Sequence, residues 1–188
     1  MSGWTKKRRL MKRYDLTASM YDLRYADEQK AKIEAALRNT KAKWLGLVLD
    51  VGCGTGILFD YITDRPEMIV GLDLSKKTLL EAKARTSKKN PDKVHLVQAD
   101  ADNMPFGDGV FDRVSAVTVL QNAPNPGKML KEIRRVAKDE AVFVLTGLKS
   151  IFSRRGFEQV LKKTGLKLEG FEDDDLKCYV TICKNSCR

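Results

Sequence analysis

Short apolar runs separated by longer amphipathic stretches make up most of the sequence. The runs have the continuous hydrophobic character of strands buried on both faces, and they lie at residues 45–51, 68–73, 94–100, 110–120 and 140–147. Between them, residues 126–138 carry apolar side chains at helical spacing, and Ser75 is placed to cap a helix that begins at Lys76. Strands that alternate with helices predict βαβ units, and therefore a parallel sheet with right-handed crossovers.

The pattern changes near both ends of the chain. Towards the C-terminus a helix is expected over 153–164, followed by two strands at 166–172 and 177–184. The four residues between these strands are too few for a parallel crossover, so the pair should form an antiparallel hairpin. Another helix is expected over 27–40. The predicted fold is thus α/β, with a seven-stranded, mostly parallel doubly wound sheet that ends in an antiparallel C-terminal hairpin.

Length and composition are those of one soluble globular domain. The chain has 188 residues, of which 43% are hydrophobic and 32% are charged. No apolar run approaches the roughly 18 residues of a membrane span, and the basic N-terminus lacks the apolar stretch of a secretory signal. We therefore expect a cytoplasmic protein without a membrane segment, with a basic N-terminal segment at 1–40 and one globular unit at 41–188.

Positive charge is concentrated near the N-terminus. The formal net charge is +10, and six of the lysines and arginines lie between Lys6 and Arg13. Such a run attracts nucleic acid, but it is equally typical of a solvated tail on a basic protein. Charge alone leaves both interpretations open.

The cysteines do not suggest a disulfide framework or a metal site. Cys53 lies in a glycine-rich loop, Cys178 and Cys183 lie in a strand-like segment, and Cys187 is next to the C-terminus. A zinc site needs a second pair of ligands or a nearby histidine, and neither is present around the C-terminal cysteines. We expect no metal, and the roles of Cys178, Cys183 and Cys187 stay open.

A glycine-rich loop, "LDVGCGTG", joins the first predicted strand to a helix. Glycines at 52, 54 and 56 allow a tight turn and let a ligand approach the backbone without meeting a Cβ atom. The dinucleotide fingerprint is G-x-G-x-x-G, whereas here the third glycine comes one place early and Ile57 occupies the later position. The spacing, with Asp50 just ahead of the loop, argues against a nicotinamide-dependent oxidoreductase.

Three acidic residues end three consecutive predicted strands. These residues are Asp50, Asp73 and Asp100, and the carboxyl ends of parallel strands border the ligand crevice of such a sheet. Asp50 suits a positively charged amino group, Asp73 suits ribose hydroxyls, and Asp100 can accept a hydrogen bond from an exocyclic amine. Together they describe a pocket for an amine, a ribose and an adenine. Asp102 is expected to be a solvated turn residue.

The order of motifs resembles that of the class I S-adenosylmethionine-dependent methyltransferases of the methyltransferase type 11, or UbiE-like, group. The matching text is "LDVGCGTG", "GLDLS", "QADADNMPF" and "FDRVSAVTVLQNAPNPGKMLKEIRRVAK". The resemblance extends over nearly the whole chain from Tyr14 to Lys184, and it implies the class I methyltransferase fold with S-adenosylmethionine as the cofactor. It also implies that 1–40 is a basic tail with lid helices and that 41–188 is the Rossmann-like domain that binds the cofactor.

The resemblance also implies a role for individual residues. Asp50 would receive the amino group of the methionine moiety, Asp73 the ribose hydroxyls and Asp100 the adenine amino group. The other cofactor-binding positions that it implies are Tyr14, Tyr21, Arg24, Gly52, Cys53, Gly54, Gly56, Leu74, Ala101, Val117, Thr118 and Gln121. Gln121 and Asn122 are the candidates on the acceptor side, and no catalytic residue is assigned.

The motifs do not name the methyl acceptor. The text "LQNAPNP" after the fourth strand departs from the N-P-P-Y sequence that marks amide or exocyclic-amine methylation. The basic N-terminus favours RNA or an RNA-associated protein, while a small-molecule acceptor and a non-catalytic cofactor-binding subunit remain alternatives. The resemblance also includes some small relatives that act on tRNA, rRNA or release factors and depend on a zinc-ribbon activator subunit, which pairs with their exposed third strand. The apolar edge expected at 94–100 fits such a partner, since exposed apolar edges are normally covered.

Overall fold

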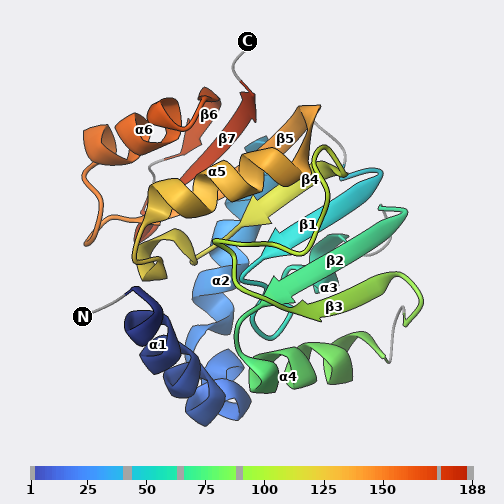
Figure 1. Cartoon of the computed structure of the whole chain (residues 1–188). Coiled ribbons are helices and arrows are strands. Elements are labelled where there is room, and N and C mark those ends of the chain that lie inside the picture. Colours follow the sequence, from blue (N-terminus) through green and yellow to red (C-terminus); the bar gives the residue numbers. More distant parts are fainter. Residues whose placement is uncertain (1–2, 40–43, 63–65, 88–90, 173–174, 186–188) are drawn as a thin grey trace.

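The protein is built around one mixed seven-stranded sheet (Figure 1). The computed structural model describes residues 3–39, 44–62, 66–87, 91–172 and 175–185. The strand order is β3-β2-β1-β4-β5-β7-β6. The strands are β1 Leu47–Val51, β2 Met68–Asp73, β3 Val94–Gln98, β4 Phe111–Ala116, β5 Ala137–Leu148, β6 Leu166–Glu172 and β7 Cys178–Asn185. β1 to β5 pair in parallel, and β7 runs antiparallel to both β5 and β6. The predicted fold class and the C-terminal hairpin are therefore confirmed.

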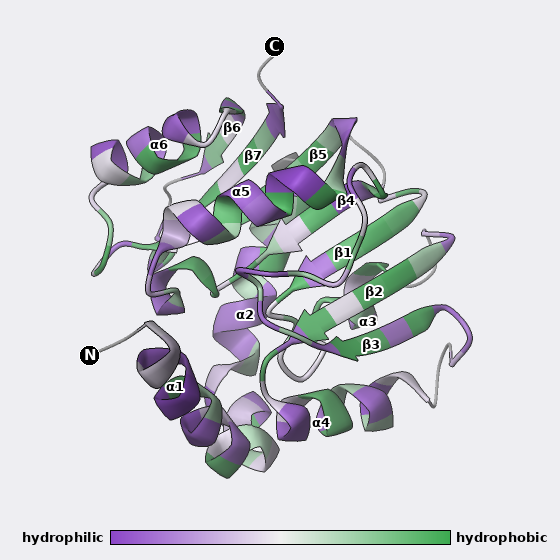
Figure 2. Cartoon of the chain, in the orientation of Figure 1, coloured by the Kyte–Doolittle hydropathy of each residue, from purple (hydrophilic) through white to green (hydrophobic). Residues whose placement is uncertain are grey.

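Helices cover both faces of the sheet. They are α1 Gly3–Thr17, α2 Tyr21–Asn39, α3 Phe59–Ile62, α4 Lys76–Thr86, α5 Pro126–Val136 and α6 Arg154–Lys163, with short 3₁₀ turns η1 Ala18–Met20 and η2 Leu120–Asn122. α5 and α6 pack on one face through residues such as Ile133 and Phe157. α2, α3 and α4 pack on the other face through Ile33, Phe59 and Leu79. Figure 2 shows the consequence, with hydrophobic strands inside and polar outer faces on the helices.

Side-chain caps set where several helices begin. Ser75 Oγ accepts a hydrogen bond from the Thr78 amide at 3.2 Å, which confirms the predicted cap of α4. Asn125 Oδ1 accepts from the Lys128 amide at 3.1 Å and starts α5 in the same way. Each cap satisfies one of the amides that a helix N-terminus leaves unpaired.

Some element boundaries differ from the sequence-based expectation. The strand expected to reach residue 120 ends at Ala116, because Thr118 adopts a left-handed φ of 61° that turns the chain out of the sheet. β5 begins at Ala137, three residues early, since α5 leads directly into it. The helix expected over 27–40 already begins at Tyr21, and the basic segment forms the helix α1.

α1 lies across the end of the sheet to which the parallel strands point (Figure 1). Asp15 Oδ1 accepts hydrogen bonds from Ser75 Oγ at 2.6 Å and from the Lys77 amide at 3.2 Å, which ties α1 to the start of α4. Tyr14 Oη accepts one from Asn122 Nδ2 at 3.0 Å on the opposite side of the crevice. The division at residue 40 stays a prediction. No helix in the described ranges has both the length and the apolar character needed to cross a bilayer.

Candidate active site

A pocket lies at the carboxyl ends of β1, β2 and β4, beneath α1. Most of the predicted cofactor-binding residues line it, namely Tyr14, Tyr21, Gly52, Gly54, Asp73, Leu74, Asp100, Ala101, Val117 and Thr118. Asp50 and Cys53 line a smaller adjoining pocket that shares Tyr21 and the glycine loop. Arg24, Gly56 and Gln121 line neither pocket, and Arg24 lies on the exposed side of α2. The cofactor-binding roles of all these residues stay predictions.

The glycine loop forms an open cradle on one side of this pocket. The Gly52 and Cys53 amides donate to the Leu72 carbonyl at 2.7 and 3.0 Å, so the loop is pinned to β2. Gly54 has a φ of 55°, and a Cβ atom added to it would meet no other heavy atom within 4 Å. The missing side chain would therefore project into free space beside Asp73. This is the space a ligand needs if it is to lie along the backbone.

Asp50 is buried at the end of β1. Its Oδ1 accepts a hydrogen bond from Ser115 Oγ at 2.6 Å on the neighbouring strand β4. Burial raises the pKa of Asp50 to about 7, and the nearby charge of Asp73 also raises it, against the lowering effect of the Ser115 hydrogen bond. A buried carboxyl group with a raised pKa is stabilised in its charged form by a cation. The environment of Asp50 therefore fits the amino group of a methionine moiety.

Asp73 is held by backbone amides on both of its carboxylate oxygens. The Gly54 amide donates to Oδ2 at 2.9 Å, and the Ser75 amide donates to Oδ1 at 2.8 Å. Burial raises the pKa of Asp73 despite these bonds. Each oxygen has a second lone pair, so the carboxylate is fixed in direction and still able to accept hydroxyl groups. That arrangement fits the ribose of the predicted cofactor.

Asp100, the third of the predicted carboxylates, is paired with a lysine from α1. Lys7 Nζ lies 2.7 Å from Asp100 Oδ1 and also pairs with Asp102. Burial lowers the pKa of Lys7, but the hydrogen bonds from its ammonium to the two carboxylates raise it more, so it stays charged. Asp102 is only 7% exposed, and its Oδ1 is buried without a hydrogen-bond partner in the described part of the chain. The expectation of a solvated Asp102 was wrong.

Lys7 was not recognised as a pocket residue because it belongs to a run of exposed cations. Its neighbours Lys6 and Arg8 are exposed, whereas Lys7 is turned inward. A signal was present in the spacing, since Leu10, Met11 and Tyr14 follow it on the same side of the helix and also line the pocket. A lysine at helical spacing from apolar residues, such as Lys7, is therefore expected to be less exposed than the other cations of the run.

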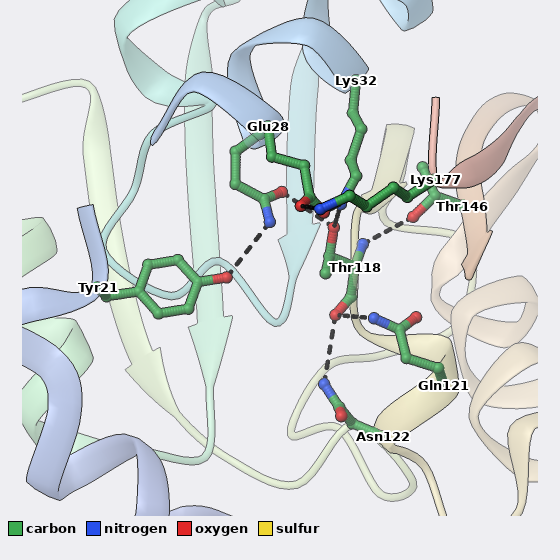
Figure 3. Close-up of polar contacts among 9 residues, drawn as sticks. Tyr21, Glu28, Lys32, Thr118, Gln121, Asn122, Thr146 and Lys177 are labelled. Carbon is green, nitrogen blue, oxygen red and sulfur yellow. Dashed lines mark hydrogen bonds and ion pairs between the residues drawn. The ribbon is translucent and has the colours of Figure 1, made fainter. Parts of the chain in front are cut away.

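The opposite wall of the pocket is organised around Thr118, the residue with the left-handed backbone (Figure 3). Lys32 from α2, only 1% exposed, donates to Thr118 Oγ1 at 3.1 Å and pairs with Glu28 Oε1 at 2.6 Å. The hydrogen bond from Lys32 lowers the pKa of Glu28. Thr118 Oγ1 in turn donates to Gln29 Oε1 at 2.9 Å. α2 is therefore linked to this wall of the pocket through buried polar groups.

The backbone of Thr118 is fixed as firmly as its side chain. Its amide donates to Thr146 Oγ1 at 2.7 Å, and its carbonyl accepts from Gln121 Nε2 at 2.8 Å and from Asn122 Nδ2 at 3.3 Å. The unusual φ of Thr118 is thus held by contacts with three elements, α2, η2 and β5, as residues in sparsely populated backbone regions require. Gln121 Oε1 is buried and has no hydrogen-bond partner among the described residues. Neither Lys32 nor Gln29 was singled out from the sequence.

Three of the cysteines can be placed. Cys53, Cys178 and Cys183 are buried free thiols. Burial raises the pKa of Cys178 to about 11 and that of Cys183 to about 12, which leaves both as neutral core residues of β7. Cys187 lies outside the described residues. Within the described ranges no group of three or more His, Cys, Asp or Glu side chains is arranged to hold a metal ion.

Comparison with known proteins supports one family. The model of the methyltransferase domain family matches residues 49–145, more than half of the chain. Malonyl-[acyl-carrier protein] O-methyltransferase from Marinomonas sp. is 34% identical over 79% of this chain and 54% of its own length. Ubiquinone biosynthesis O-methyltransferase from Dechloromonas aromatica is 33% identical over 61% of this chain and 52% of its own length. The chain thus spans about half the length of these curated relatives.

A solved structure gives the same fold over a longer range. In a complex between the Trm112 methyltransferase activator of Haloferax volcanii and a methyltransferase, the similar chain superimposes with a TM-score of 0.81 at 19% identity, over 93% of this chain and 98% of that one. The fold, the glycine cradle beside Asp73 and the family match agree with one another. The chain belongs to the class I S-adenosylmethionine-dependent methyltransferases of the UbiE-like type.

Proposed function

We propose that this chain is a cytoplasmic enzyme that transfers a methyl group from S-adenosylmethionine to RNA or to an RNA-associated protein. The observation that carries the proposal is the division of α1 into two faces. One face lines the pocket, and the other exposes Lys6, Arg8, Arg9, Lys12 and Arg13. A polyanion bound to the outer face would lie beside the pocket, and lysine and arginine are the side chains that most often contact phosphates.

In this proposal the protein's residues bind and orient rather than react. When bound, S-adenosylmethionine supplies an electrophilic methyl group on its sulfonium. Asp50 holds the amino group of the methionine moiety, Asp73 holds the ribose, and Thr118 with Asn122 forms the wall beside which an acceptor is aligned. Alignment alone can supply a large part of a rate acceleration. A general base is needed only for acceptors such as an amide or a hydroxyl group.

A zinc-ribbon activator protein on the β3 edge is the second part of the proposal. β3 is an edge strand whose Leu96 and Val97 are half-buried, so its outer backbone groups and apolar side chains are available for pairing. The similarity in fold to a methyltransferase in complex with the Trm112 activator supports this choice. Hydrogen exchange on the co-expressed pair should show new protection of the Val94–Gln98 amides. A complex that leaves these amides unprotected would contradict the edge-pairing model.

A small or carrier-bound acceptor is the other candidate, because the curated relatives include a ubiquinone biosynthesis O-methyltransferase and a malonyl-[acyl-carrier protein] O-methyltransferase. The deciding experiment is to supply S-adenosylmethionine with a labelled methyl group to cell extract and protein, and to separate RNA, protein and small molecules. Label in RNA or ribosomal protein supports the proposal. Label only in small molecules or a carrier protein selects the other candidate, and no transfer at all in the presence of cofactor binding indicates a non-catalytic subunit.

A further inference from the structure

A basic groove lies at the end of the sheet opposite the cofactor pocket. It is formed where the C-terminal turns of α5 and α6 meet the start of β5, and it encloses about 930 Å³. Among the described residues, its charged lining consists of six cations, Lys131, Arg134, Arg135, Lys138, Lys162 and Lys163, and two acids, Asp108 and Asp139. This groove was not predicted from the sequence, where only the N-terminal cations stood out.

The groove retains uncompensated charge after its internal ion pairs are formed. Arg135 pairs with Glu132 and Asp108, and Lys138 pairs with Asp112. The exposed residues Lys131, Lys162 and Lys163 form no ion pair with any described residue. Three ammonium groups are therefore free to meet a ligand from solution.

Arg134 is held in a fixed orientation in the groove. Its Nε donates to Asn185 Oδ1 at 3.1 Å, a neutral acceptor that leaves the charge of the guanidinium in place. The guanidinium lies against Gly165, where an added Cβ atom would stand 2.3 Å from Nη1. The φ of 78° at Gly165 and the missing side chain together make room for it. A planar guanidinium held in this way is suited to bidentate contact with a phosphate.

Helix-end electrostatics explain only part of this arrangement. Cations in the last turn of a helix interact favourably with its carbonyl end, by about 0.3–1 kcal/mol each, and this accounts for Arg134, Lys162 and Lys163. It does not account for Lys128 in the first turn of α5 or for Lys131 in its middle. With Arg134 these residues recur every three positions, so they form one row along the exposed side of the helix.

This row connects the groove to the cofactor pocket. α5 is about 16 Å long, and it runs from the pocket side of the molecule to the groove (Figure 1). The start of α1 adjoins the segment before α5, since a Cβ atom on Gly3 would lie 3.8 Å from that of Pro124. In Figure 2, hydrophilic residues are visible along the outer side of α5 between the pocket side and the groove. From Lys128 to Arg134 the row rises about 9 Å along the helix, which is enough for two or three phosphates of one strand.

We propose that the α5 row and the α5–α6 groove bind the sugar–phosphate backbone of RNA, as a second contact surface for the acceptor whose modified residue enters the pocket. This inference rests on the proposed RNA-linked function. A phosphate backbone fits better than an acidic protein surface, because Ala137 is the one apolar side chain among the lining residues that the structure describes. Protein interfaces usually have an apolar core with aromatic anchors, and this groove offers none.

Three double variants that each remove two positive charges test the proposal. They are Lys162→Gln/Lys163→Gln in the groove, Arg8→Gln/Arg9→Gln on α1, and Lys30→Gln/Lys83→Gln as a control on exposed positions of α2 and α4. Binding of fluorescent total tRNA and of a single-stranded 20-mer is measured by anisotropy between 50 and 300 mM salt. Each lost phosphate contact should reduce the log–log salt slope by about 0.7 for a single strand, and the groove variant should bind on the order of tenfold more weakly at 0.1 M salt.

The outcomes separate this inference from the proposed function. Weaker binding by the groove and α1 variants, with an unchanged control, supports both. If the groove variant binds like the control while the α1 variant is weakened, the groove inference fails and the RNA function stands. If the wild-type protein shows no salt-dependent binding to either RNA, both fail. Equal binding of polyglutamate and RNA, with equal losses in the groove variant, would overturn the assignment to a phosphate backbone.

Discussion

Two lysines from the N-terminal helices are largely buried, one in the lining of the pocket and one in contact with Thr118, which also lines the pocket. Lys7 on α1 pairs with Asp100 and Asp102, and its side chain is 11% exposed. Lys32 on α2 pairs with Glu28 and contacts Thr118, and its side chain is 1% exposed. Both are charged groups taken largely out of water, which is costly unless the partners compensate for the lost hydration.

The partners of the two lysines differ in a way that separates a removable contact from a permanent one. Glu28 lies one turn before Lys32 on the same helix, so this pair forms whenever α2 is folded. The partners of Lys7 lie beyond the end of β3, so its ion pairs exist only while α1 is docked on the sheet. Asp100 is also the carboxylate predicted to accept from the adenine amino group. The predicted cofactor would therefore compete with Lys7 for Asp100, whereas no part of it is predicted to replace Lys32.

The largest effect is expected when Lys32 is replaced by methionine. Removing one member of a buried pair typically costs 3–5 kcal/mol. Because Lys177 still contacts Glu28 at 3.2 Å, we expect a loss of about 3 kcal/mol in the free energy of unfolding. Urea denaturation measures it. Lys30→Met on the same helix, whose pair with Glu34 is exposed, should change the stability little. A Lys32→Met protein as stable as Lys30→Met would contradict the structural role of Lys32.

Gly54→Val tests the glycine loop, which lines both the main pocket and the smaller adjoining pocket. A branched side chain would fill the open cradle, so S-adenosylmethionine affinity should fall at least about 100-fold, which corresponds to about 2.7 kcal/mol. Calorimetric titration gives the affinity and thermal unfolding reports the fold. Gly109→Val is the matched control, since Gly109 also has a positive φ and open space at its Cβ position but lies away from the pocket. Equal affinities in the two variants would show that the glycine loop does not bind the cofactor.

Lys7→Met should tighten cofactor binding by about tenfold, or about 1.4 kcal/mol. The adenine amino group would no longer compete with an ammonium for Asp100, and the cost of leaving Asp102 unpaired would fall mainly on the free protein. Lys6→Met, which changes an exposed lysine on the same helix, serves as the control in the same titration. Weaker binding by Lys7→Met would mean that Lys7 remains in place and assists the cofactor, which would remove the distinction between the two lysines.

The smallest expected effect is a pH dependence through Asp50. The pKa of Asp50 is about 7 in the free protein, above its ordinary value of 3.8. Between these two pH values the folded chain retains a proton that the unfolded chain has lost. The stability contributed by this group is therefore present below about pH 4 and lost as the pH rises through 7. A cationic cofactor favours the ionised form, so its affinity should increase about five-fold from pH 6 to pH 7. Asp50→Asn should abolish this change, and a persisting pH dependence in that variant would assign it to another group.

Much of the fold was predictable from local pattern. Continuous apolar runs marked β1 and β2, and the four-residue gap before β7 allowed only a hairpin. The acids at 50, 73 and 100 could be brought together without knowing any contact, because the ends of adjacent parallel strands share one edge of the sheet. The open space at Gly54 was predictable for a similar reason, since it depends on the backbone alone.

The continuous apolar run at 110–120 did not predict where β4 would end. Residues 110–120 are apolar enough for a longer strand, but Thr118 leaves the sheet because the Thr146 hydroxyl, Gln29 and Lys32 bind it there. Contacts of this kind join residues 28 to 89 positions apart in sequence. Strand propensity is a weak preference that tertiary contacts of this strength override.

Local patterns were sufficient to predict the sheet, the ligand-binding edge and the family, because these follow from periodicities and motifs carried by neighbouring residues. Which lysines are buried and which are exposed depends instead on packing between distant parts of the chain. Lys6 and Lys7 are chemically identical neighbours, and their difference arises from how α1 docks against Asp100 and Asp102. The free cations of the α5–α6 groove likewise come from elements brought together only by the folded sheet. A long charged side chain takes its environment from the surface it meets, and that surface is defined by packing at a distance.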